Sequence, residues 1–364
     1  LLLDRFLDDS SDEAYGKLVD ELMMSPRFGE HQARYWLDAV RYGDTHGLHL
    51  DNKRGIYPYR DWVVRALNQN LPLDQFITWQ LAGDLLAEPT LEQKIATGYV
   101  RLNPSTGEGG AIPAEFQMKN NFDRVETLGT VFLGMSLTCA RCHTHKYDPI
   151  PQTEYYRLLA FFNSTAEPSM DGNKYEYGPV AKVPKDQASW KEWSQLLKLR
   201  GDLIRQVYNR LESGESVVAA TLKKWLSSSD AERLNLLAAP DGGFDQFELA
   251  KHAVELKKQI EQAEAAFTTT LVAQDLPQPR STHVLKRGEY DLPIGELLQP
   301  GILEVMGSFP EDSPRNRLGL ANWLTAREHP LVARVLINRV WQRVLWTGAD
   351  SGRFRTARTA ADSS

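Results

Sequence analysis

The chain has 364 residues, of which 42% are hydrophobic and 25% are charged, which is the composition of a globular protein and the length of two or three domains. Its formal net charge is -6, and its basic residues form no stripe interleaved with aromatic residues, so the sequence argues against nucleic acid as a partner. No apolar run reaches about 18 residues, so we expect no membrane span in this chain. The N-terminal residues also lack the basic and apolar regions that are typical of a signal peptide.

The first predicted elements are helices. The segment "SSDE", residues 10–13, has the Ser-x-x-Glu spacing of a capping box and predicts a helix that runs to Pro26. A second helix follows directly and ends at Gly43. Further helices are expected to begin near Tyr59, Pro72 and Leu91.

A segment rich in glycine and proline, "NPSTGEGGAIP" at residues 103–113, predicts a loop. After it, apolar residues at spacings of three and four predict a helix over residues 114–138. The residues of this stripe are Val125, Leu128, Phe132, Met135 and Cys139. The stripe therefore places the first cysteine at the end of a helix, with Met135 in the core.

The middle of the chain is predicted to hold a helical arm. Residues 168–187 are polar and contain glycine, so we expect a linker there. Residues 188–276 carry two long amphipathic stripes, one beginning at Trp193 and one ending at Phe267, which predict a helical hairpin.

The end of the chain is predicted to form a C-terminal segment, residues 277–348, and a disordered tail, residues 349–364. The segment contains "STHVLKRG", which predicts one short strand, and "HPLVARVLINRVWQRVLW", a helix that is apolar nearly all round and is therefore expected to be buried. The predicted fold class is mainly α, with a multi-helical domain, a helical hairpin, a C-terminal helical segment and minor β structure.

Both cysteines of the chain lie in "CARCHTHKYDP", residues 139–149. In a Cys-x-x-Cys-His turn the two thiols lie on one side and can each add to a vinyl group of one haem, while the imidazole of the next residue ligates the iron. Cys139, Cys142 and His143 fit this chemistry residue for residue. The motif therefore predicts covalently bound haem c, with His143 as an axial ligand of the haem iron.

Three other interpretations of the cysteines stay open. A Cys-x-x-Cys redox disulfide usually follows a strand in a βαβ unit, which this sequence does not predict. A structural zinc site would need four ligands, and Cys139, Cys142, His143 and His145 are crowded into one short segment without a second pair. A motif this short can also arise by chance.

Several long segments of the chain resemble, in order, the planctomycete cytochrome-c-associated family. They include "RYWLDAVRYGDTHG", "EQKIATGYVRLNPSTGEGG", "EFQMKNNFDRVETLGTVFLGMSLTCARCHTHKYDPIPQTEYYRLLAFFN" and "HPLVARVLINRVWQRVLWTG". The family's Cys-x-x-Cys-His motif, followed by His, Lys, an aromatic residue, Asp and Pro, falls on residues 139–149. The resemblance implies a cytochrome-like domain over residues 1–167, a partial planctomycete-specific module over residues 277–348, haem binding and an extracytoplasmic setting, but it implies no established reaction.

The chain departs from this family in two places. No segment of the sequence resembles the family's first cytochrome module, and the tail after Gly348 does not resemble the further helical region with which family members continue.

Further candidate site residues carry weaker signals. His145 and Asp148 could support the motif by hydrogen bonding or could join His143 in holding a metal. Glu108, in a glycine-rich loop, could act as an acid or base or could serve only a tight turn. For Asp123 and Arg124 a buried ion pair is favoured at least as much as a catalytic role. The candidate sixth ligands of the haem iron are His46, His49 and Met118.

The expected function is a periplasmic or secreted c-type cytochrome that transfers electrons to a redox partner protein. Covalent haem is assembled outside the cytoplasm, so we expect the full-length gene product to carry an export signal. Two alternatives stay open: an enzyme whose haem or metal acts on a substrate such as a polysaccharide, and a scaffold in which the cysteines form a disulfide.

Overall fold

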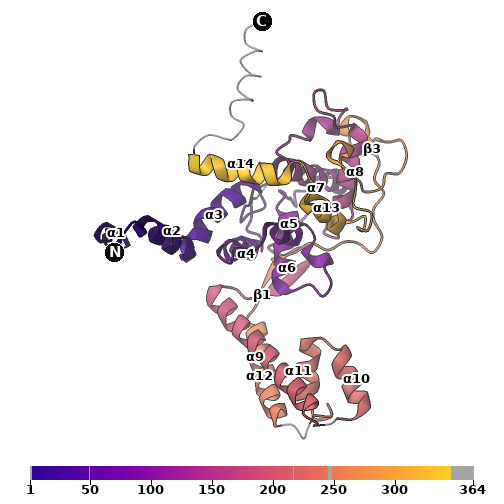
Figure 1. The fold of residues 1–364 in the computed structure, drawn as a ribbon. Helices are drawn as coiled ribbons and strands as arrows, with labels where there is room; N and C mark the ends of the chain where they lie inside the picture. Colours follow the sequence, from indigo (N-terminus) through magenta and orange to yellow (C-terminus); the bar gives the residue numbers. More distant parts are fainter. Residues whose placement is uncertain (1, 49, 216, 245–247, 346–364) are drawn as a thin grey trace. The chain divides into compact units, whose positions relative to one another are not determined.

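The structure is a computed structural model that describes residues 2–48, 50–215, 217–244 and 248–345. These residues form two compact units, one made of residues 2–181 and 270–345 and the other of residues 182–269. Helices dominate and the strands are short (Figure 1), so the predicted mainly α class is confirmed. Within the described residues, no helix is both long enough and apolar enough to cross a membrane.

The first unit is built from helices that precede and follow the second unit in sequence. Its α-helices are α1 (Leu2–Asp8), α2 (Ala14–Met24), α3 (Pro26–Ala39), α4 (Tyr57–Asn68), α5 (Leu73–Ala82), α6 (Leu91–Ala96), α7 (Pro113–Leu128), α8 (Gln152–Asn163), α13 (Arg317–Thr325) and α14 (Val332–Leu345). Strands β3 (Val284–Leu285) and β4 (Pro293–Ile294) pair antiparallel. The short strand predicted in "STHVLKRG" is therefore confirmed.

An aromatic cluster and the hydrogen bonds of one buried glutamine join α3, α4 and α5. Trp62 stacks on Phe76 with ring centroids 5.3 Å apart, and both rings are buried. The amide oxygen of Gln80 accepts hydrogen bonds from Trp36 Nε1 at 2.9 Å and from the Tyr59 hydroxyl at 2.6 Å. Because a buried polar atom is costly unless it is paired, these two hydrogen bonds to Gln80 fix the register of the three helices.

Arg317, the first residue of α13, is buried among helices from the N-terminal half. Its guanidinium donates to Asp84 Oδ1 at 2.9 Å, to Asp275 Oδ1 at 2.9 Å and to the carbonyl oxygen of Leu81 at 2.7 Å. The side chain of Arg317 is fully enclosed. The C-terminal segment predicted at residues 277–348 is therefore, over its described part, integrated into the first unit rather than folded by itself.

The second unit contains two long helices and two short ones. They are α9 (Gln187–Glu212), α10 (Ala219–Ser227), α11 (Asp230–Ala238) and α12 (Leu249–Ala265). The Trp193 ring near the start of α9 contacts the Phe267 ring, which follows the end of α12, at a centroid distance of 5.0 Å. The long helices therefore run antiparallel, as in the predicted hairpin, and α10 and α11 are an addition that the two stripes did not indicate (Figure 1).

The chain connects the units through strands β1 (Val180–Val183) and β2 (Thr268–Leu271), which pair in a two-stranded sheet. Residues 168–181, part of the predicted linker, belong to the first unit. The reason is Arg101, whose buried guanidinium donates to the carbonyl oxygens of Tyr177 at 2.9 Å and Pro179 at 3.1 Å. These hydrogen bonds give residues 168–181 a defined structure, although their composition is typical of a loop.

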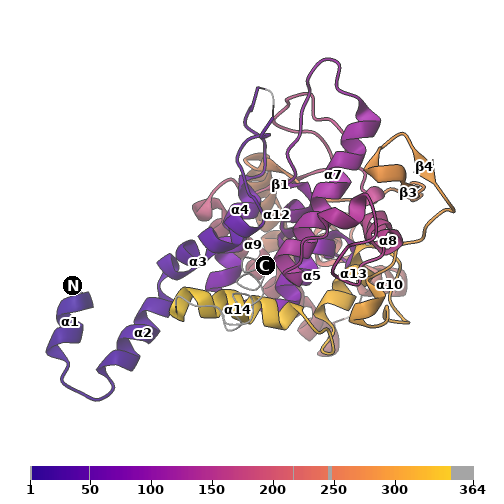
Figure 2. The same cartoon turned by 90° about the horizontal axis from the view of Figure 1, so that it is seen from above.

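Helix α14 departs from the prediction that it is buried. Of its residues only Val332 is buried, and the exposed apolar residues are Ile337, Val340, Trp341, Val344 and Leu345. Together with α3 and the region around α4 and α5, α14 lines an open groove of about 730 Å³. Figure 2 shows α14 beside α3. The prediction was wrong because an apolar pattern does not show whether other parts of the chain cover it.

The turn before α14 contains a histidine that should make stability depend on pH. The Nδ1 atom of His329 accepts from the backbone N–H groups of Leu331 at 3.2 Å and Val332 at 3.3 Å. Burial lowers the pKa of His329 from 6.5 to about 4. In the folded protein the ring therefore stays neutral over a range in which the unfolded chain binds a proton.

We therefore expect the contribution of His329 to the free energy of unfolding to be greatest above pH 6.5 and to fall by about 1–2 kcal/mol as the pH drops from 6.5 towards 4. Urea unfolding at a series of pH values measures this loss. The variant His329→Asn keeps an acceptor for the two N–H groups but cannot take up a proton, so its pH dependence should be flatter by the same amount. Parallel curves for the two proteins would contradict the assignment.

Candidate functional site

The cysteine motif lies on a short turn that follows a helix break. Helix α7 continues through a π-helical turn (Gly129–Leu133), and Gly134 then ends it with a φ of 64°. The predicted helix over residues 114–138 therefore stops early, and Met135 is half-buried rather than part of a helical core stripe. The cysteines instead occupy a separate 3-10 turn (Thr138–Arg141) and its C-cap.

This turn is anchored on the apolar side by Leu137 and Ala140, which are fully buried. The chain approaches itself closely there: a Cβ on Gly129 would lie 2.7 Å from Cγ of Leu137. On the other side, the Tyr156 hydroxyl donates to the carbonyl oxygen of Arg141 at 2.9 Å. The turn is thus anchored in the core, and the residues that follow it, 142–144, are exposed.

Cys139 and Cys142 are free thiols, and both are exposed. In a 3-10 turn, side chains at positions i and i+3 are eclipsed, which brings two thiols at this spacing to one side. The Cys142 thiol donates a hydrogen bond to the carbonyl oxygen of Arg287 at 3.1 Å. That carbonyl lies in the connection between β3 and β4, so this hairpin borders the motif.

His143 follows as an exposed side chain with one nitrogen engaged. Its Nδ1 lies 2.8 Å from the carbonyl oxygen of Thr144. A carbonyl can only accept, so Nδ1 carries the proton and Nε2 keeps a free lone pair. The ring therefore has the tautomer that a backbone carbonyl typically fixes for ligating histidines, with the Nε2 lone pair available to a metal ion.

His145 has a different role from His143. Its Nδ1 accepts hydrogen bonds from the backbone N–H groups of Asp148 at 2.8 Å and Tyr147 at 3.3 Å. The Asp148 carboxylate lies 3.3 Å from the same nitrogen. The His145 ring thus closes the turn after the motif.

Within the described residues, no group of three or more His, Cys, Asp or Glu side chains is arranged to hold a metal ion. The structure therefore does not combine His143, His145 and Asp148 into a shared metal centre.

Of the three proposed sixth ligands, His46 is held by residues outside the motif. His46 is fully enclosed, with Nδ1 2.7 Å from Asp171 Oδ2 and Nε2 2.9 Å from the carbonyl oxygen of Lys174. Both ring nitrogens lie against buried oxygen atoms, so neither faces an open space in which iron could bind. Met118 lines a cavity of about 280 Å³ together with His283. His49 lies outside the described residues.

Glu108 lies with the loops around His46 rather than with the cysteines. Its loop packs closely on the segment near Asp171, since a Cβ on Gly107 would lie 2.4 Å from Cα of Gly172. The Glu108 side chain is exposed, and its backbone N–H donates to Thr106 Oγ1 at 3.2 Å.

The expected ion pair between Asp123 and Arg124 is not formed. Asp123 pairs with Arg41, and the buried Arg124 pairs with Glu167. Burial acts to raise the pKa of Glu167, but the charges of Arg124 and Arg101 outweigh it and lower that pKa to about 2. Adjacent residues on a helix point in different directions, which is why neighbours in sequence take separate partners.

One titratable group near the motif was missed by sequence reasoning. Glu126, near the end of α7, interacts with the Thr138 side chain, directly before Cys139. Burial, with the nearby Asp123 charge, raises the pKa of Glu126 above its ordinary value. No local pattern marks this residue, because its environment depends on the chain reversal at Gly134.

Comparison with known families places the motif inside a recognised module. Residues 2–167 match the family model PSCyt2, described as a protein of unknown function (DUF1549), and residues 316–349 match PSD1, described as a protein of unknown function (DUF1553). Both families are named for planctomycete cytochrome-like modules. The first match includes the whole cysteine turn, and the second covers only part of the module that the resemblance implies over residues 277–348. No curated protein and no solved structure matches the chain.

Proposed function

We propose that the first unit is a c-type cytochrome module that binds haem covalently through Cys139 and Cys142, with His143 as an axial ligand. In this proposal the protein works in the periplasm or outside the cell and exchanges electrons with a redox partner protein. When bound, haem would supply one-electron redox chemistry.

The observation that carries the proposal is the state of His143. Its Nδ1–H donates to the carbonyl oxygen of Thr144, which orients the ring and leaves Nε2 free. Two free thiols on the preceding turn supply the groups that thioether bonds need. The three side chains therefore match the donors of haem c in type and in order. All three are exposed, so haem could reach them from solvent.

The surrounding residues would keep the donors in place. Leu137 and Ala140 fix the turn in the core, and the His145 ring holds the chain that follows. A ligand residue held by buried neighbours loses less conformational freedom when it binds.

The test is expression with a cytochrome c maturation system. The denatured protein should retain haem, because thioether bonds survive unfolding. His143→Ala should still attach haem but with a shifted absorption spectrum, since attachment and axial ligation are separate functions. His145→Ala is the matched control and should change the spectrum little. A colourless product with two free thiols and stoichiometric zinc would overturn the proposal.

A second candidate is a scaffold whose cysteines form a reversible disulfide. The observation that favours it is that both thiols are free and exposed on one turn. In this case the protein would lose two thiols on mild oxidation and regain them on reduction, with no haem attached after maturation.

A further inference from the structure

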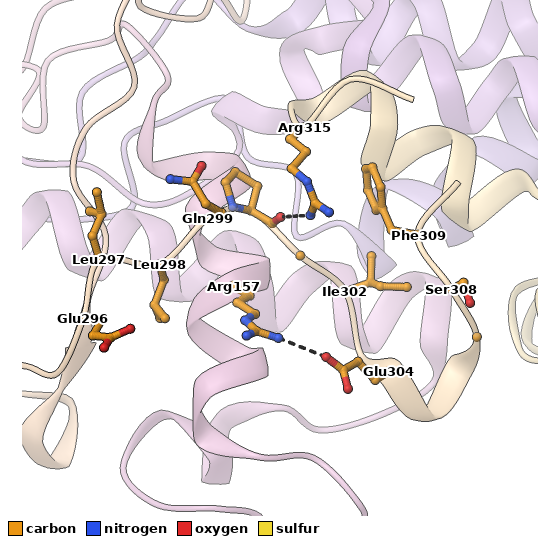
Figure 3. A pocket seen from close by; sticks show the side chains of 13 residues that line it. Arg157, Glu296, Leu297, Leu298, Gln299, Ile302, Glu304, Ser308, Phe309 and Arg315 are labelled. Atoms are coloured by element: carbon orange, nitrogen blue, oxygen red, sulfur yellow. Dashed lines mark hydrogen bonds and ion pairs between the residues drawn. The ribbon is translucent and has the colours of Figure 1, made fainter. Parts of the chain in front are cut away.

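A cavity of about 810 Å³ opens beside α8, in a part of the first unit that the sequence did not single out (Figure 3). It is bounded by Arg157 of α8, by Arg315 and by an irregular segment over residues 296–309. This volume lies in the range of small-molecule sites. The cysteine motif does not line it, so its occupant would be distinct from the group bound there.

The irregular segment has a shape that two glycines specify. The N–H of Gly301 donates to the carbonyl oxygen of Arg157 at 3.1 Å, and a Cβ on Gly301 would lie only 3.2 Å from Arg157 Cδ. Gly307 has a φ of 110°, which residues with a side chain rarely adopt. Ile302 and Leu303 are buried and anchor the segment. The wall of the cavity is therefore a defined structure.

Two guanidinium groups line this cavity, and each is only lightly engaged. Arg157 Nη1 lies 3.0 Å from Glu304 Oε1, in a pair whose side chains are 40% and 71% exposed. Arg315 Nη1 donates to the carbonyl oxygen of Pro300 at 2.7 Å. Among the described residues, the other N–H groups of these two side chains have no protein acceptor. A guanidinium offers five donors, so most of this capacity is available to a ligand.

Both polar and apolar side chains complete the cavity, and the polar ones are Glu296, Gln299 and Ser308. The Phe309 ring lies 5.1 Å from the Arg315 guanidinium carbon, and Figure 3 shows it on the same side as Ile302. Leu298 also lines the wall. The cavity thus combines two guanidinium groups, the carboxylates of Glu296 and Glu304 and some apolar surface, which suits an organic molecule rather than a bare inorganic ion.

We propose that this cavity binds an organic dianion, with one oxyanion group on the Arg157 guanidinium, the other on that of Arg315, and an apolar or ring-shaped body against Phe309 and Ile302. The ligand would displace the Glu304 carboxylate from Arg157. Exposed ion pairs contribute little to stability, so this exchange costs little. Carboxylates, sulfate esters and phosphate esters share the required geometry for a bidentate bond to arginine.

The test is calorimetric titration of the full chain with 1,4-phenylenediacetate and 1,4-phenylene disulfate, with inorganic phosphate as the third probe. We expect saturable binding of at least one organic dianion, weaker binding of phosphate, and a loss of affinity at higher salt. Arg157→Gln and Arg315→Gln should each weaken binding about tenfold or more. The lysine variants should fall between, because they keep the charge but lose the planar fork.

Two further variants separate recognition from general charge effects. Arg27→Gln removes one positive charge at an exposed site on α3 and should leave binding unchanged. Glu304→Gln removes the carboxylate that competes with the ligand for Arg157, so it should tighten binding severalfold. If Glu304 only stabilised the structure, this substitution would not tighten binding. Absence of saturable binding for all three probes would overturn the proposal. So would a double variant Arg157→Gln/Arg315→Gln that binds with the same affinity as the unsubstituted protein.

Discussion

Replacing Arg317 with methionine is expected to lower the free energy of unfolding by about 3–5 kcal/mol, a large part of the stability of a typical domain. The side chain is fully enclosed, and it neutralises Asp84 and Asp275 together. Without it, two carboxylates would face each other in a site from which water is largely excluded. Urea unfolding monitored by circular dichroism measures the loss.

The pH dependence of this variant distinguishes loss of charge from loss of packing. Burial raises the pKa of Asp275 even with Arg317 in place. In Arg317→Met we expect that pKa to rise further, so that the folded state binds more protons than the unfolded state at mildly acidic pH. The stability deficit should therefore shrink as the pH falls towards 5. Arg27→Met, at an exposed position, should cost little at any pH, and a similar loss in both variants would contradict the argument.

The sequence predicted elements whose evidence is local. The turn at Cys139–His143, the strand at residues 284–285 and the two long helices of the second unit all depend on residues a few positions apart. Helix spacing also predicted an apolar stripe up to Cys139, but the reversal at Gly134 could not be foreseen, because a glycine within a helical pattern is tolerated at a modest cost and does not by itself mark the end of a helix.

The parts that escaped prediction depend on contacts between distant segments. The enclosed pair of His46 and Asp171 joins two loops that are far apart in sequence. The exposure of α14 depends on what the rest of the chain leaves uncovered. The Arg157 and Arg315 cavity likewise needs a helix and a later irregular segment, and neither carries a recognisable motif.

The boundary of the second unit provides the sharpest contrast between sequence and structure. The sequence predicts an arm over residues 188–276, whereas the compact unit ends at Thr269. The following residues are bonded into the first unit: the N–H of Ala273 donates to Thr97 Oγ1 at 2.8 Å, and Arg101 donates to the carbonyl oxygen of Val272 at 2.8 Å. Asp275 then pairs with Arg317.

Two deletions with similar bounds should therefore have opposite outcomes. Removing residues 182–269 and joining Ala181 to Thr270 by a short Gly-Ser linker should leave the first unit folded, because β1 and β2 are paired neighbours and the gap between them is short. Removing Asp186–Leu276 should prevent folding, because it takes away the partners of Thr97 and Arg101 and leaves Arg317 without Asp275. Urea unfolding and circular dichroism compare the two proteins.

A third protein isolates the cause. In the folded 182–269 deletion, Asp275→Ala removes one carboxylate from Arg317 but leaves Asp84 and the backbone bonds of residues 272–273 in place. It should stay folded with reduced stability, since a buried cation that loses one of two partners keeps part of its compensation. Cooperative unfolding in the larger deletion, equal to that in the smaller one, would show that residues 270–276 do not belong to the first unit's core. Loss of structure in both deletions would show instead that the first unit needs the second to fold.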